Sequence, residues 1–133
     1  MKAVSLSIRS NEHSQVILIR GEVEDALEKL AAKDGLCHLW CPHTTAALTV
    51  NEGADPDVAV DFLKRLEELV PWQAGYRHAE GNSAAHIKSI IVGPSLTLPV
   101  QSGRLALGTW QNVYLCEFDG PRRRTLDLRF LPD

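Results

Sequence analysis

The chain has 133 residues, of which 44% are hydrophobic and 23% charged, and a formal net charge of −3. This composition is typical of one globular domain with a sizeable core. The basic residues are scattered apart from the run Arg122-Arg123-Arg124, which argues against a nucleic-acid-binding surface, and no apolar run is long enough to span a membrane. An odd cysteine count without a signal peptide argues against disulfides and predicts a cytoplasmic protein.

The apolar pattern predicts an alternation of strands and helices that no repeat, low-complexity segment or linker divides. In chain order, we expect strands at 2–9 and 14–20, a helix at 22–33, strands at 36–41 and 46–50, a helix from 56 to about 70, a helix at 82–92, and strands at 95–100, 104–107, 113–118 and 125–130. The fold class is therefore α+β, with one domain over residues 1–133. Its core would be an antiparallel-rich or mixed sheet covered by about three helices.

Short polar or glycine-containing segments separate these elements. Asn11-Glu12-His13 predicts a hairpin between the first two strands, and Gln101-Ser102-Gly103 predicts a second hairpin near the C-terminus. Asp55 followed by Pro56 is typical of a helix start, with Asp55 as the N-cap. Asp119-Gly120-Pro121-Arg122 predicts a tight turn between the last two strands, and Arg123 and Arg124 after it would form a solvated strand face.

Residues 78–86, with the sequence HAEGNSAAH, gather two imidazoles, a carboxylate and an amide in one short stretch. Asn82 or Ser83 is a natural N-cap for the helix that follows, because a short side-chain oxygen can accept from the free first-turn amides. His86 would lie in that first turn, where the helix end favours the neutral imidazole that binds metals. A second polar cluster, over residues 43–55, adds His43. We expect the two clusters to meet in a three-histidine metal site with one open position.

Three long segments resemble the YjbQ-like family of small proteins, also called secondary thiamine-phosphate synthases. The segments are HTTAALTVNEGADPDV, YRHAEGNSAAHIKS and GRLALGTWQNVYLCEFDGPRRR, and the resemblance covers almost the whole chain from about residue 36. It implies the fold of that family, a compact homotrimer and histidine-rich polar pockets that hold metal ions. It also implies a weak activity that joins a pyrimidine pyrophosphate to a thiazole phosphate and gives thiamine phosphate.

The polar residues can be assigned roles in such chemistry, because displacing pyrophosphate requires neutralising a highly charged leaving group. A divalent metal, zinc or magnesium, and helix-start amides would do this together with basic side chains. A carboxylate would accept a hydrogen bond from an imidazole N–H or act as the general base. The candidates are the metal ligands His43, His78 and His86, the catalytic carboxylates Glu80, Glu52 and Asp55, and the substrate-binding residues Asn51, Asn82, Lys88, Trp110, Gln111 and Arg122. For Trp110, a role in the core beside Gly108 is an equal alternative.

Three functions remain open on these residues. The first is a metal-dependent enzyme that acts on a small phosphorylated metabolite. The second is a metal-assisted hydrolase in which Glu80 activates water. The third is a non-catalytic protein that binds a phosphorylated metabolite or a metal. Catalysis requires an open metal position and a base, whereas binding requires neither.

Overall fold

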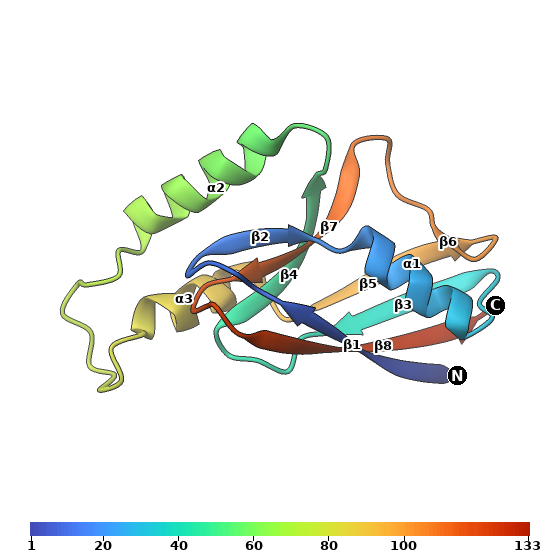
Figure 1. Ribbon diagram of the computed structural model, residues 1–133, viewed down its shortest axis with the longest axis horizontal. Coiled ribbons are helices and arrows are strands. Elements are labelled where there is room, and N and C mark those ends of the chain that lie inside the picture. Colours follow the sequence, from blue (N-terminus) through green and yellow to red (C-terminus); the bar gives the residue numbers. More distant parts are fainter.

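The computed structural model describes residues 1–133 and has an α+β fold with two antiparallel sheets and three helices (Figure 1). In chain order the elements are β1 (Lys2–Arg9), β2 (Gln15–Leu18), α1 (Arg20–Lys29), β3 (Gly35–Trp40), β4 (Ala46–Glu52), α2 (Pro56–Leu69), α3 (Ser83–Val92), β5 (Ser95–Gln101), β6 (Arg104–Leu105), β7 (Gln111–Glu117) and β8 (Arg123–Pro132). No helix has the length and apolar character that crossing a membrane would require.

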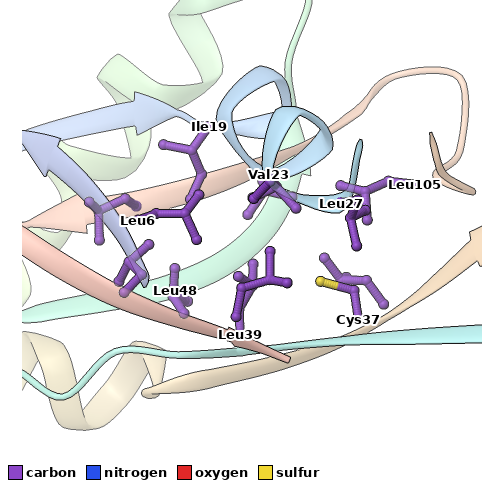
Figure 2. Close-up of a cluster of buried hydrophobic side chains, with 14 of the residues drawn as sticks. Leu6, Ile19, Val23, Leu27, Cys37, Leu39, Leu48 and Leu105 are labelled. Atoms are coloured by element: carbon purple, nitrogen blue, oxygen red, sulfur yellow. The ribbon is translucent and has the colours of Figure 1, made fainter. Parts of the chain in front are cut away.

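The two sheets share one hydrophobic core. The larger sheet has the strand order β1-β8-β3-β5-β6 and the smaller has β2-β7-β4. Side chains from both sheets meet inside, with Leu39 from the larger sheet and Leu48 from the smaller one in the same buried cluster. Val23 and Leu27 of α1 complete this cluster, and Figure 2 shows these side chains converging. Helix α1 lies toward the end of the molecule that holds both chain termini (Figure 1).

Helices α2 and α3 cover the other face of the smaller sheet. Tyr114 and Cys116 of β7 point into a second apolar cluster, which contains Ala85 of α3 and Leu66 of α2. Leu66 is the only buried residue of α2, and Ala59, Phe62 and Leu63 pack against the same cluster while partly buried. The smaller sheet is therefore apolar on both faces, and most of β7 is buried whichever way its side chains point.

The helix starts and the C-terminal hairpin follow the local sequence. Asp55 caps α2, because its side chain accepts a hydrogen bond from the N–H of Asp57 at 2.9 Å, and Pro56 opens the helix. Strands β5 and β6 pair directly, with Val100 opposite Leu105, as the predicted second hairpin requires.

The predicted hairpin between the first two strands is wrong. β1 pairs with β8 in the larger sheet, whereas β2 pairs with β7 in the smaller one. The chain crosses between sheets after Ser10, which is buried and whose N–H donates to the carbonyl of Arg122 at 2.9 Å. Alternating side chains identify a strand but do not select its partner, which is fixed here by contacts more than a hundred residues away in sequence.

A glycine at the start of β3 allows a close backbone approach, and this generates a prediction for stability. A Cβ at Gly35 would meet the carbonyl oxygen of Leu131 at 2.1 Å and Cα of Pro132 at 2.9 Å. We expect Gly35→Ala to lower the free energy of unfolding by at least about 2 kcal/mol, measured by chemical denaturation. Gly21→Ala in α1, where nothing lies within 4 Å of the added methyl, is the matched control and should be neutral or stabilising. Equal stability of the two variants would contradict this.

Candidate functional site

Three segments far apart in sequence meet at one end of the protein. They are the loop from β3 to β4, the start of α3 and the turn from β7 to β8. Arg124 of β8 binds Thr45 of the first loop, and Asn82 at the start of α3 binds Asp119 of the turn. His43 of the loop contacts the backbone of Thr125. These contacts bring together half of the polar residues that the sequence singled out, including all three histidines.

A buried ion pair between Arg124 and Glu117 lies beneath this end. Their side chains are 2% and 0% exposed. One guanidinium nitrogen donates to Glu117 Oε1 at 2.9 Å and another to Oε2. The same guanidinium donates to the carbonyl oxygen of Thr45 at 3.0 Å and to its hydroxyl at 2.8 Å. The prediction of a solvated face is therefore wrong for Arg124, although Arg123 is exposed, because the inward face of β8 includes Arg124.

The Glu117 carboxylate is held in its charged form. Ser10 donates its hydroxyl hydrogen to Oε1 at 2.7 Å, and the N–H of Asp119 donates to Oε2 at 3.1 Å. Burial raises the pKa of Glu117, but the hydrogen bonds from Arg124 and Ser10 outweigh burial and leave this pKa below its usual value. The buried network is therefore an ion pair in which both charges are hydrogen-bonded.

His43 is anchored through one ring nitrogen to β8. Its Nε2 lies 3.0 Å from both the nitrogen and the carbonyl oxygen of Thr125. The register of β3 and β8, with Trp40 opposite Asp127, would place Pro42 opposite Thr125, and proline has no N–H to donate. The imidazole takes the place of that missing ladder contact. Burial and then the charge of Arg124 lower the pKa of His43, so the ring is neutral at neutral pH.

A cavity of about 400 Å³ lies between the loop and α3. His43 and His86 both line it, and so do Ser89 and Ile90 of α3. His78 lies against His86, with ring centroids 5.0 Å apart and ring planes at 84°. Through His86, the structure thus brings the three predicted histidines to one place, which we call the histidine cavity.

The pair His78 and His86 is compatible with a shared metal ion, but the three-histidine set is not formed within the chain. Two imidazoles on one zinc ion, with Zn–N distances of about 2.0–2.1 Å, have ring centroids roughly 5 Å apart. The observed separation of 5.0 Å is close to this value, and at a plane angle of 84° it is equally an ordinary edge-to-face ring contact. No group of three His, Cys, Asp or Glu side chains is arranged to hold an ion, however. His43 is kept apart by its contact with the backbone of Thr125.

The start of α3 carries the predicted anion-binding groups. Asn82 is the N-cap residue, but its side chain does not cap the helix; its Nδ2 donates to Asp119 Oδ2 at 2.9 Å instead. Of the first-turn amides, that of Ala85 donates to the backbone carbonyl of Asn82 at 3.0 Å, so only those of Ser83 and Ala84 are left to other acceptors. Arg122 donates to the same carboxylate oxygen at 3.2 Å, and its side chain is half exposed. Glu80 lies beside the histidines, with its Oε2 3.9 Å from Nε2 of His78.

Lys88 occupies a different position from the one its predicted role requires. The residue is 2% exposed, and its ammonium pairs with Glu67 of α2. Lys88 does not line the histidine cavity. A phosphate contact from Lys88 would have to break the link between α3 and α2.

The other predicted residues lie at the far end of β4, so only the part of the second cluster that contains His43 meets residues 78–86 within one chain, and the expectation is wrong for residues 51–55. Ala46 to Glu52 spans roughly 20 Å at ~3.3 Å per residue. Glu52 accepts from the N–H groups of Ala54 and Asp55 at 2.8 and 3.2 Å, which fixes the turn into α2. Gln111 lies opposite Glu52 in the sheet. Asn51 lines a separate hollow beneath α2.

Trp110 also lies at this far end. Its carbonyl accepts from the N–H of Gly53 at 2.7 Å, while its side chain is 66% exposed. The alternative role of Trp110 in the core is therefore wrong.

Sequence reasoning missed His13 and Asp119 as members of this end. Asp119 accepts from Asn82 and Arg122, and its Oδ1 lies 3.7 Å from Nε2 of His13. The ring of His13 makes an edge contact with Trp72 at a centroid distance of 4.4 Å. The signal that points to Asp119 is its place in the turn next to Arg122. His13 has no such signal, because its position depends on the crossing from β1 to β2.

These features define a class of small α+β proteins in which two antiparallel sheets, covered by helices, carry a histidine-lined cavity at one end. Within that class, the chain belongs to the family described as UPF0047 protein YjbQ-like, whose model matches residues 4–133. It is 48% identical to the UPF0047 protein YugU of Bacillus subtilis, over 96% of this chain and 97% of that one. It is 41% identical to the UPF0047 protein MJ1081 of Methanocaldococcus jannaschii, over 95% and 91%.

Solved structures have the same fold. An uncharacterized conserved protein of the YjbQ/UPF0047 family from Clostridium acetobutylicum superposes with a TM-score of 0.92 at 41% identity, over 96% of this chain and 99% of that one. The hypothetical protein APE1520 from Aeropyrum pernix K1 superposes with a TM-score of 0.94 at 37% identity, over all of both chains. The α+β fold predicted from the sequence is thereby confirmed.

The buried pair generates a prediction about stability. Arg124→Met leaves Glu117 as an unpaired buried charge and should cost about 3–5 kcal/mol at neutral pH. Replacing both partners, in Glu117→Met/Arg124→Met, should recover most of that loss, because apolar side chains need no hydrogen-bonded partner. Chemical denaturation of both variants measures the difference. A double variant as unstable as the single one would contradict this account.

The same double variant has an expected pH dependence. The folded pKa of Glu117 is lowered from 4.5, so its stabilising effect is complete above about pH 4.5 and is lost as the pH falls below that value. The free energy of unfolding of the double variant should therefore fall less steeply below about pH 4.5 than that of the wild type. The pKa of Glu67 is also lowered, but Glu67 is present in both proteins, so its contribution to the pH dependence of stability is the same in both.

Proposed function

We propose that the protein is a metal-assisted enzyme that acts on a small phosphorylated metabolite in the histidine cavity. The observation that carries this proposal is that His43 and His86, from different elements, line one cavity of about 400 Å³ with His78 against His86. That volume is in the range of small-molecule sites. Histidines from separate elements in one cavity are typical of catalytic and metal-binding sites.

The surroundings of the cavity favour an anionic substrate. The first turn of α3 presents the positive end of the helix dipole, and Asn82 does not cap it. The guanidinium of Arg122 is half exposed at the same end. Phosphate oxygens would accept hydrogen bonds from Arg122. The dipole of α3 would add attraction without direct contact, because Ser83, Ala84 and Ala85 are buried.

The reaction we favour is the displacement of pyrophosphate from a phosphorylated small molecule, as in a weak thiamine-phosphate synthase. A zinc ion held by His78 and His86 would neutralise charge on the leaving group. Magnesium, the other candidate, would be held by phosphate and carboxylate oxygens instead. Glu80, which is close to His78 and 76% exposed, is the carboxylate best placed to accept a proton. The same free carboxylate supports a second candidate, a metal-assisted hydrolase in which Glu80 activates water.

We further propose that the chain forms a homotrimer in which the far end of β4 in one copy approaches the histidine cavity of the next. Exposed apolar side chains flank both places: Ile90 and Ile91 near the cavity, and Val60 and Trp110 at the far end. Contact between copies would bury them. It would also let Glu52, Asp55, Asn51, Trp110 and Gln111 reach the substrate. The three buried free thiols favour the reducing cytoplasm.

The trimer proposal predicts the mass in solution. Light scattering at micromolar concentration should give three times the mass of the chain, 14.7 kDa. Ile91→Asp should shift the mass toward the monomer, because a charge at a buried interface is costly. A monomeric wild-type protein at this concentration would contradict the proposal.

His86 provides the test of the site itself. His86→Ala should abolish metal binding and turnover of a panel of pyrophosphates and phosphate esters, while lowering the free energy of unfolding by about 1 kcal/mol or less. His38→Ala is the control, because His38 lies on β3 and does not line the cavity. Retained metal with a loss of roughly 1–3 kcal/mol would instead identify His86 as a structural histidine. Metal binding that needs His86 without turnover of any compound would indicate a binding protein.

A further inference from the structure

We propose that Arg124 and Glu117 are positioning residues that hold His43 so that it meets its ligand through Nδ1 alone. This inference rests on the proposed function of the histidine cavity and adds to it which atom of His43 acts and what fixes that atom. Contacts of both His43 and Thr45 with β8 fix the loop that carries the ring.

One ring nitrogen of His43 is already engaged by the backbone of β8. Nε2 of His43 lies 3.0 Å from the nitrogen and from the carbonyl oxygen of Thr125. A neutral imidazole can accept from that N–H, with its proton on Nδ1, or donate to that carbonyl, with a lone pair on Nδ1. In both tautomers Nε2 is occupied by the backbone. Nδ1 is therefore the only ring nitrogen left for a substrate or an ion in the cavity that His43 lines.

Arg124 keeps the loop that carries His43 together with strand β8. Arg124 immediately precedes Thr125, the residue that anchors the imidazole. Its guanidinium donates to both the carbonyl and the hydroxyl of Thr45, two residues after His43. Arg124 thus joins the strand that anchors the ring to the loop that carries it. Glu117 fixes the guanidinium through both carboxylate oxygens, and Ser10 fixes Glu117.

Positions 117 and 124 carry charged residues for a reason other than stability. A buried ion pair can often be replaced by apolar side chains without loss of stability, so stability alone does not explain it. Apolar side chains cannot hold the Thr45 carbonyl and hydroxyl, however. Lysine cannot do so either while also making a two-point contact with Glu117, since it lacks the planar fork of arginine. The charged pair is therefore explained by a need to hold the loop that carries His43 in one position.

The experiment compares the full-length wild type with Glu117→Met/Arg124→Met, which removes the positioning contacts without leaving a buried charge. Nitrogen-15 NMR of the histidine rings in the ligand-free protein reports the tautomer of His43. We expect one dominant tautomer in the wild type and averaged ring-nitrogen signals in the double variant. Glu67→Met/Lys88→Met removes the ion pair between half-exposed Glu67 of α2 and buried Lys88 of α3, and should leave the His43 signals unchanged. If the double variant does not unfold cooperatively, Arg124→Lys is used in its place with the same expectation.

Zinc and inorganic pyrophosphate then serve as probes. In the wild type, each probe that binds should shift the Nδ1 signal of His43 and leave Nε2 on Thr125. The affinity for that probe should fall about tenfold to hundredfold in the double variant. A shift at Nε2, or His43 signals and probe affinities that are unchanged in the double variant, would overturn the proposal. If neither probe binds, the proposed function fails, whereas the ligand-free comparison still decides whether the pair positions His43.

Discussion

The ion pair between Arg124 and Glu117 is the contact on which one whole end of this protein depends. Removing two charges from water is costly, and the cost is offset only when every polar group around them is paired. The chain meets that condition with groups from four segments: the two charges from β8 and β7, the hydroxyl of Ser10 from the crossing between β1 and β2, and Thr45 from the loop after β3. Because these segments belong to different sheets, satisfying the pair also fixes how the sheets close.

That closure separates two kinds of polar residues along the length of β4. At its start, the loop with His43 is tied to β8, and the opening of α3 is tied to Asp119. At its end, Tyr114 donates to the carbonyl of Glu52 at 2.6 Å, and Glu52 shapes the turn into α2. Each end is fixed by its own hydrogen bonds, and the strand between them spans roughly 20 Å. Chemistry that needs both sets therefore requires two copies of the chain rather than bending of one.

The sequence predicted what depends on neighbouring residues and failed where distant residues decide. Asp55 and Pro56 start α2 by local capping chemistry, and the stretch from His78 to His86 was recognisable because its members are close in sequence. The partners of β1 and β2, and the contact of His43 with Thr125, join residues far apart, which no local pattern encodes. For Arg124 a signal did exist. Alternation extended back from the inward Leu126 places Arg124 inside, but a run of three arginines usually indicates a solvated face.

The electrostatics of the histidine cavity follow from the same arrangement. Burial and the fixed charge of Arg124 lower the pKa of His43, so its imidazole is neutral at the pH where a phosphate monoester is largely dianionic. Protonated histidine is therefore not needed to attract the anion. The positive groups at this end are instead Arg122 and the start of α3, which carry positive charge or potential independently of pH in this range. If these groups hold the proposed anionic substrate, Nδ1 of His43 would be free to donate or accept a proton, or to bind a metal, because Nε2 alone contacts Thr125.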